Sequence, residues 1–96
     1  MSARSGSELL EALSALANPH RLQIITALLN ETNYVSQLAR EIGISRPLLI
    51  MHLKKLEDAG LVKSRLELSG DGKAMRYYEV VNFDIRLTPE LISKAK

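Results

Sequence analysis

Leucine residues recur at helical spacing near the start of the chain. In SELLEALSALANP this pattern predicts a helix over about residues 7–16 that carries Leu9, Leu10, Leu13 and Leu16. Asn18 and Pro19 end this helix and begin another, because asparagine can accept a hydrogen bond from an unpaired backbone amide and proline fits the first helical position. The second helix runs through HRLQIITALLN, and its predicted apolar stripe consists of Leu22, Ile25, Leu28 and Leu29.

The next two helices are separated by a tight turn. YVSQLAREIG predicts a short helix, and Gly43 is suited to its left-handed end. Ser45 is expected to cap the following helix, with Pro47 in its first turn, so the segment has the pattern of a helix-turn-helix. The apolar side of the short helix is Val35, Leu38, Ala39 and Ile42. At about 100° per residue, the inner side of the longer helix is Leu49, His52, Leu53, Leu56 and Gly60.

Alternating residues after Gly60 predict a β-hairpin. LVKSRLELS and AMRYYEVVNF read as strands, and GDGK between them can form a turn with positive φ. Side chains alternate along a strand, so Lys63 and Arg65 should form a basic strip that points away from the core, with Glu67 on the same face. The inward-facing residues are expected to be Val62, Ser64, Leu66, Leu68, Tyr78 and Val80.

The end of the sequence, TPELISKAK, predicts a last short helix over about residues 89–95, capped by Thr88. The expected fold is therefore mainly α with a small β-hairpin (α+β), in a winged helix-turn-helix arrangement. The chain of 96 residues should form a single domain over 1–96.

Composition narrows the class of protein. There is no cysteine and no apolar run long enough for a membrane span, so we expect a cytoplasmic domain without disulfides, thiolate metal sites or a membrane partner. The net charge of +2 is too small to indicate a polyanionic partner, but residues 46–76 contain seven basic and four acidic side chains. No nucleophile with a base, no carboxylate pair and no cofactor motif is suggested by the spacing, so an enzyme is not expected.

The segments LANPHRLQIITALL and VSQLAREIGISRPLLIMHLKKLEDAGLVKSR resemble the ArsR (arsenic-repressor) family of bacterial and archaeal transcriptional regulators. GDGKAMRYYEV resembles the family's wing, and the whole resemblance covers about residues 8–83. It implies a homodimeric repressor that binds a palindromic operator in double-stranded DNA, with the helix from Ser45 to Ala59 in the major groove. The family commonly dimerises through its first and last helices, which would here contribute Leu9, Leu10, Leu13, Leu16, Leu91 and Ile92.

The sequence departs from the family's metal sensors. It lacks their cysteines, and its last helix has no histidine for the second kind of family site, so no metal or cofactor is expected. His20 and His52 are interpreted as isolated imidazoles, the first on the surface and the second half-buried and bonded to a backbone carbonyl. A signal would have to act through an unknown small-molecule effector, through pH at a histidine, or through abundance.

The second departure is the apolar surface of the predicted recognition helix, where Leu48, Ile50 and Met51 replace the polar residues common in the family. These side chains could touch thymine methyl groups, or they could form a patch that binds another protein. The basic residues nearby favour DNA. The predicted DNA-binding residues are Ser45, Arg46, Pro47, Leu48, Ile50, Met51, Lys54, Lys55, Lys63, Arg65, Lys73 and Arg76.

Overall fold

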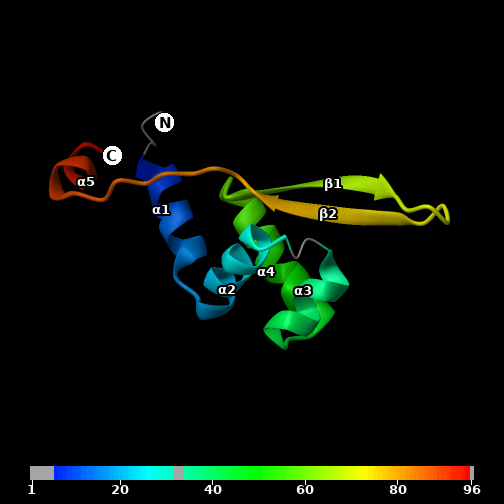
Figure 1. The fold of residues 1–96 in the computed structure, drawn as a ribbon. Helices are drawn as coiled ribbons and strands as arrows, with labels where there is room; N and C mark the ends of the chain where they lie inside the picture. The colour runs from blue at the N-terminus through cyan, green and yellow to red at the C-terminus, as the bar shows by residue number, and fades with distance from the viewer. Residues whose placement is uncertain (1–5, 32–33, 96) are drawn as a thin grey trace.

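The elements follow one another in the predicted order. The computed structural model describes residues 6–31 and 34–95. Within them lie, in sequence, α1 (Gly6–Leu16), α2 (Pro19–Leu29), α3 (Val35–Ile42), α4 (Arg46–Asp58), β1 (Val62–Leu68), β2 (Ala74–Val80) and α5 (Pro89–Lys94) (Figure 1). The helices form the body, and the hairpin projects from it. This arrangement confirms the predicted mainly α fold with a β-hairpin wing.

Polar caps begin three of the helices, as the sequence predicted. The side chain of Asn18 accepts hydrogen bonds from two backbone amides in the first turn of α2. Ser45 caps α4 by accepting from the Leu48 amide at 3.3 Å, and Thr88 caps α5 in the same way. Gly43, with φ +79°, ends α3 in the left-handed conformation that a glycine adopts without a steric cost. These local signals fix where the helix-turn-helix bends.

The core lies where α1, α2, α3 and α4 meet the base of the hairpin. Its fully buried side chains are Ile24, Leu38, Leu49, Leu53, Leu56, Leu61 and Val62. The apolar sides predicted for α3 and α4 are confirmed, except that Ala59 is buried in place of Gly60, which has φ +76° and is exposed. A glycine in this conformation ends the helix, so its position no longer follows the helical arc.

The predicted apolar stripe of α2 is partly wrong. Leu22 and Leu29 are exposed at 52% and 69%, whereas Ile24 and Ala27 are buried together with Leu28. Leucine, isoleucine and alanine occupy several overlapping arcs of this helix, so its pattern alone does not select one face. Packing of α2 against α1, α3, α4 and β2 selects it instead.

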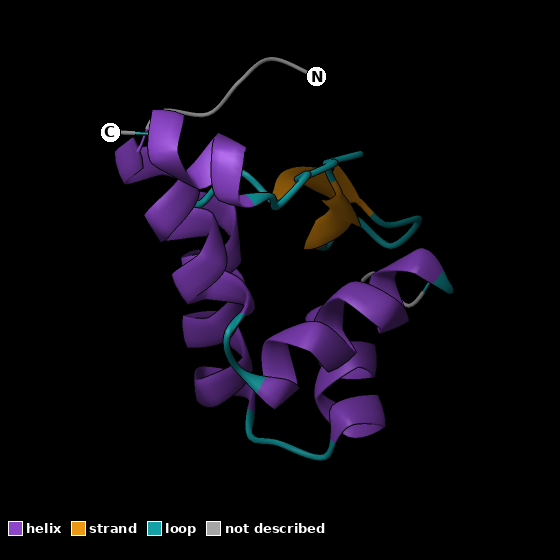
Figure 2. Ribbon diagram, turned by 90° about the vertical axis from the view of Figure 1, so that its left-hand side faces the viewer, coloured by secondary structure: helices purple, strands orange, loops and turns teal. Residues whose placement is uncertain are grey.

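The hairpin extends beyond the body that supports it. β1 and β2 pair antiparallel, and the base of the hairpin belongs to the core through Val62 and Tyr78. Leu66 and Leu68 belong to the same face, but they are 62% and 78% exposed because the outer half of the hairpin has no helix beneath it (Figure 1). Figure 2 looks along the hairpin and shows its strands foreshortened beside the helices. Tyr34 adds one antiparallel bridge to β2, opposite Tyr77. The molecule is therefore elongated, with extents of 52 × 24 × 21 Å.

After β2 the chain runs back past α1 and carries α5 to the end of the molecule opposite the wing (Figure 1). One predicted interface residue, Leu9, is only 6% exposed within the single chain. It lies on the same inner side of α1 as Ala12 and Ala15, so little of its side chain is available to a dimer interface. In the described part of the chain, no helix is long and apolar enough to cross a membrane.

Candidate nucleic-acid interface

The exposed side of α4 begins at its capped end. Ser45, Arg46 and Pro47 are exposed in the first turn, followed by Ile50 and Met51 at 48% and 56%. Leu48 is half-buried, which reduces the predicted apolar patch to two strongly exposed side chains. The structure therefore offers a surface that starts with one cation and continues with two apolar residues.

The inner side of α4 carries a buried polar contact. His52 is 4% exposed, and its Nδ1 lies 3.0 Å from Nη1 of Arg21 on α2. Arg21 also donates from Nε to the carbonyl of Ala15 at 2.6 Å, near the end of α1. A guanidinium can only donate, so Nδ1 must accept and His52 must be neutral. Burial, reinforced by the charge of Arg21, holds the pKa of His52 below its usual value.

Two expectations about the histidines are wrong. His52 bonds to Arg21 and not to a backbone carbonyl, because the guanidinium reaches the buried ring from the neighbouring helix. His20 and His52 are not isolated, since their ring centroids lie 5.5 Å apart in an edge-to-face arrangement. No group of three metal-ligating side chains occurs within residues 6–31 and 34–95.

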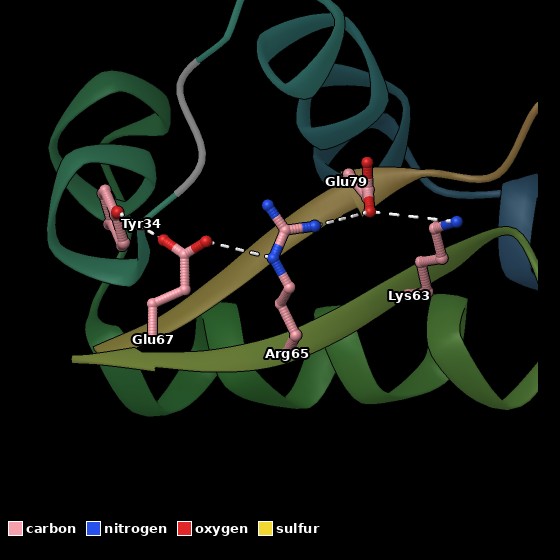
Figure 3. A network of polar contacts seen from close by, with 5 residues as sticks. All are labelled: Tyr34, Lys63, Arg65, Glu67 and Glu79. Atoms are coloured by element: carbon pink, nitrogen blue, oxygen red, sulfur yellow. Dashed lines mark hydrogen bonds and ion pairs between the residues drawn. The ribbon is translucent and has the colours of Figure 1, made fainter. Parts of the chain in front are cut away.

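One face of the wing carries a network of paired charges (Figure 3). Glu67 accepts from Arg65 Nε at 3.0 Å and from the Tyr34 hydroxyl at 3.1 Å. Arg65 Nη1 also donates to Glu79 at 3.1 Å, and Lys63 lies 3.8 Å from the same carboxylate oxygen. The network links the two strands to one another and links β1 to the residue that precedes α3.

The basic strip points away from the core as predicted, but its Lys63 and Arg65 are paired with carboxylates. The hydrogen bond that Arg65 donates to Glu67 raises the pKa of the Arg65 guanidinium, and the guanidinium lies 4.2 Å from the centre of the Tyr77 ring. The same carboxylate raises the pKa of Tyr34. In a hairpin whose turn is centred on Asp71, Lys63 lies opposite Glu79. The pairing of these two residues could therefore have been predicted by counting outward from the turn.

The other predicted cations differ in their surroundings. Lys54 pairs with Asp58 at 3.4 Å across one helical turn, with both side chains largely exposed. Lys55 and Lys73 are exposed, and neither forms an ion pair with any described residue. Arg76 donates to the hydroxyl of Ser64 at 3.1 Å, on the wing face opposite Arg65. The prediction therefore grouped free and neutralised cations together.

A cleft of about 330 Å³ lies between α4 and the wing. The N-terminal part of α4 contributes Arg46 and Ile50 to it, and β2 contributes Arg76. The remaining lining residues are Tyr34, Val35, Ser36, Ala74, Met75 and Tyr78. The cleft thus brings together two arginines that are 30 positions apart in the sequence and that no local sequence pattern connects.

Apolar side chains are exposed at the other end of the molecule. Leu10 on α1 and Ile92 on α5 are 69% and 56% exposed. Leu13, Leu16 and Leu91 are half-buried, and Leu16 packs against the core. Of the predicted interface, Leu10 and Ile92 offer the largest exposed fractions.

Comparison with known proteins links this arrangement to transcriptional regulators. The pattern of the family described as bacterial regulatory protein, arsR family, matches residues 18–64. An uncharacterized HTH-type transcriptional regulator of Methanocaldococcus jannaschii is 41% identical over 80 residues, which cover 83% of each chain.

Solved structures show the same arrangement of elements. NolR from Sinorhizobium fredii superposes with a TM-score of 0.65 at 30% identity, over 91% of this chain and 76% of NolR. The homodimeric winged helix-turn-helix DNA-binding domain of a possible ArsR-family regulator from Mycobacterium bovis gives 0.68 at 30% identity, over 77% of this chain and 64% of that one.

Proposed function

The chain belongs to the ArsR family and is a DNA-binding transcriptional regulator, and from this premise we propose that it acts as a homodimeric repressor on a palindromic operator. In this proposal α4 enters the major groove of double-stranded DNA and the wing lies along the adjacent backbone. A dimer with twofold symmetry would place its two α4 helices on two equivalent half-sites.

The exposed N-terminal half of α4 is the observation that carries the proposal. The inner side of this helix is buried through Leu49 and Leu53, so the opposite side stands clear of the body. Arg46 can donate to the DNA backbone from the first turn of α4, and Ile50 and Met51 can contact thymine methyl groups. Lys55 and Lys73 are available for phosphates because no described carboxylate pairs with them.

The proposed homodimer uses the apolar surface of α1 and α5. Leu10 and Ile92 are exposed there, together with the half-buried Leu13 and Leu91. The related domain from Mycobacterium bovis is homodimeric, which supports the same assembly here. In the dimer these leucine and isoleucine side chains would be withdrawn from water, which is the main favourable term in such an association.

Selection from a random duplex pool, followed by fluorescence anisotropy on the selected site, tests the proposal. We expect a palindromic site, salt-sensitive binding, and one dimer per duplex by sedimentation. Arg46→Ala should weaken binding to the selected site and to random DNA by a similar factor, because a phosphate contact carries no sequence information. Absence of binding at low salt would refute the proposal and would turn attention to protein partners of Ile50 and Met51.

A further inference from the structure

The two faces of the wing differ in how their cations are neutralised. On one face, Lys63 and Arg65 are held by Glu67 and Glu79. On the other face, Arg76 forms no ion pair with a described residue and is bonded to a hydroxyl. A phosphate that approaches the first face would have to compete with two carboxylates already in place, whereas the second face imposes no such competition.

The free face of the wing is the one that meets α4. Arg76 lies opposite Leu66 in the hairpin register. It shares its face of β2 with Tyr78, two positions further on, whose side chain is buried against the body. Side chains alternate between faces, so the neighbouring Tyr77 belongs with Arg65 on the paired face. Arg76 therefore reaches the cleft that Arg46 lines from the first turn of α4.

We propose that Arg46 and Arg76 together hold one phosphate of the DNA backbone in the cleft between α4 and the wing, and that Arg65 makes no phosphate contact. This inference rests on the proposed DNA binding. It specifies how the DNA backbone would be held between the wing and the major groove that α4 would enter. Two guanidinium groups suit one phosphate because each presents a planar fork of donors to its oxygens.

The surroundings of Arg76 orient it for this contact. Its Nη1 donates to Ser64 Oγ at 3.1 Å, and that hydroxyl donates to Glu57 at 2.9 Å. This chain occupies one donor of the guanidinium and leaves the others for an incoming ligand. Glu57 is linked to Arg76 through the Ser64 hydroxyl and forms no ion pair with it. Ile50 adds an apolar wall that can contact the sugar next to the phosphate.

The salt dependence of DNA binding can distinguish the roles of Arg46 and Arg76 from that of Arg65, which serves as the matched control. Each phosphate neutralised contributes about 0.9 to the slope of log affinity against log salt concentration. Anisotropy titrations on the selected duplex would compare Arg46→Ala, Arg76→Ala, the double variant and Arg65→Ala, after circular dichroism shows that each is folded. If the arginines share one phosphate, each single change reduces the slope by less than about 0.9 per protomer, and the double change reduces it by about 0.9 per protomer.

The control lies on the same hairpin with the same chemical change. Arg65→Ala should leave the slope unchanged, and a reduction of about 0.9 per protomer would overturn the proposal. A reduction of about 1.8 per protomer in the double variant would also overturn it, because the arginines would then hold separate phosphates. Wild-type protein that fails to bind any duplex would instead refute the proposed function itself.

A duplex with single neutral methylphosphonates gives an independent readout. A methylphosphonate at one position in each half-site should weaken binding of the wild type. The same substitution should have no further effect on binding of the double variant. If Arg46→Ala and Arg76→Ala remove sensitivity to two different positions, the shared site is refuted.

Discussion

Removing Arg21 should destabilise the protein far more than removing an exposed arginine. Arg21 joins three parts of the fold, because its guanidinium donates to the end of α1 and to His52 on α4 while its backbone belongs to α2. Arg21→Ala removes these bonds and leaves Nδ1 of His52 without its donor. Because His52 is only 4% exposed, this unpaired nitrogen would be buried. The change therefore affects the helix that we propose reads DNA.

The expected loss is about 3 kcal/mol. A hydrogen bond from a charged group contributes about 1.5–3 kcal/mol, and Arg21 makes two such bonds of good length, at 2.6 and 3.0 Å. We take the lower end of this range for each bond because the side chain of Arg21 is only partly buried. A loss of this size is a large part of the about 5–15 kcal/mol that stabilises a typical domain.

Urea unfolding followed by circular dichroism, at fixed protein concentration, measures this loss. Arg86→Ala is the matched control, since that arginine is exposed in a loop, and it should change the free energy of unfolding by less than about 0.5 kcal/mol. A double-mutant cycle between Arg21→Ala and His52→Ala should show a coupling energy of about 1 kcal/mol or more. A loss below about 1 kcal/mol with no coupling would refute the assigned contact.

The same contact gives a pH dependence with a defined sign. The pKa of His52 is lowered in the folded protein, so the unfolded chain takes up the proton first as the pH falls. The free energy of unfolding should therefore decrease as pH drops below about 6.5, the ordinary value for histidine. His52→Gln should flatten this decrease between pH 7.5 and 5.5, and an unchanged slope would contradict the role given to His52.

Three further substitutions test the packing and the turn. Leu53→Ala should cost about 3–5 kcal/mol in urea unfolding because this side chain is fully buried, whereas Leu66→Ala, at 62% exposure on the wing, should cost less than about 1 kcal/mol. Gly43→Ala should lower stability by about 1 kcal/mol or more, because alanine is strained at φ +79°, and a thermal midpoint equal to that of the wild type would exclude this explanation.

Local sequence signals predicted the fold well. Caps, prolines and Gly43 act on residues a few positions away, so Asn18, Ser45 and Thr88 could be assigned from the sequence alone. Strand alternation likewise placed Tyr78 inward. The exposed fractions of Leu66 and Leu68 could not be predicted, because alternation gives the face of a strand and not the length of the body beneath it.

The site was harder to predict because its contacts join distant residues. Arg21 and His52 are 31 positions apart, and no local pattern connects an arginine on α2 with a histidine on α4. The cleft between Arg46 and Arg76 depends in the same way on how the hairpin packs against the helices. Charge counting also failed on the wing, because it treats Arg65 and Arg76 alike although only Arg65 is paired with carboxylates.

The alternating charges of β1 also bear on aggregation. β1 is at the edge of the hairpin, and no strand in the described part of the chain pairs with its outer side. An exposed edge with apolar residues such as Leu66 and Leu68 is a template for pairing with another chain. Lys63, Arg65 and Glu67 interrupt that edge with charge, and a second copy would have to desolvate their ion pairs in order to add a strand. The network that holds the wing thereby also protects the protein from intermolecular β-sheet growth.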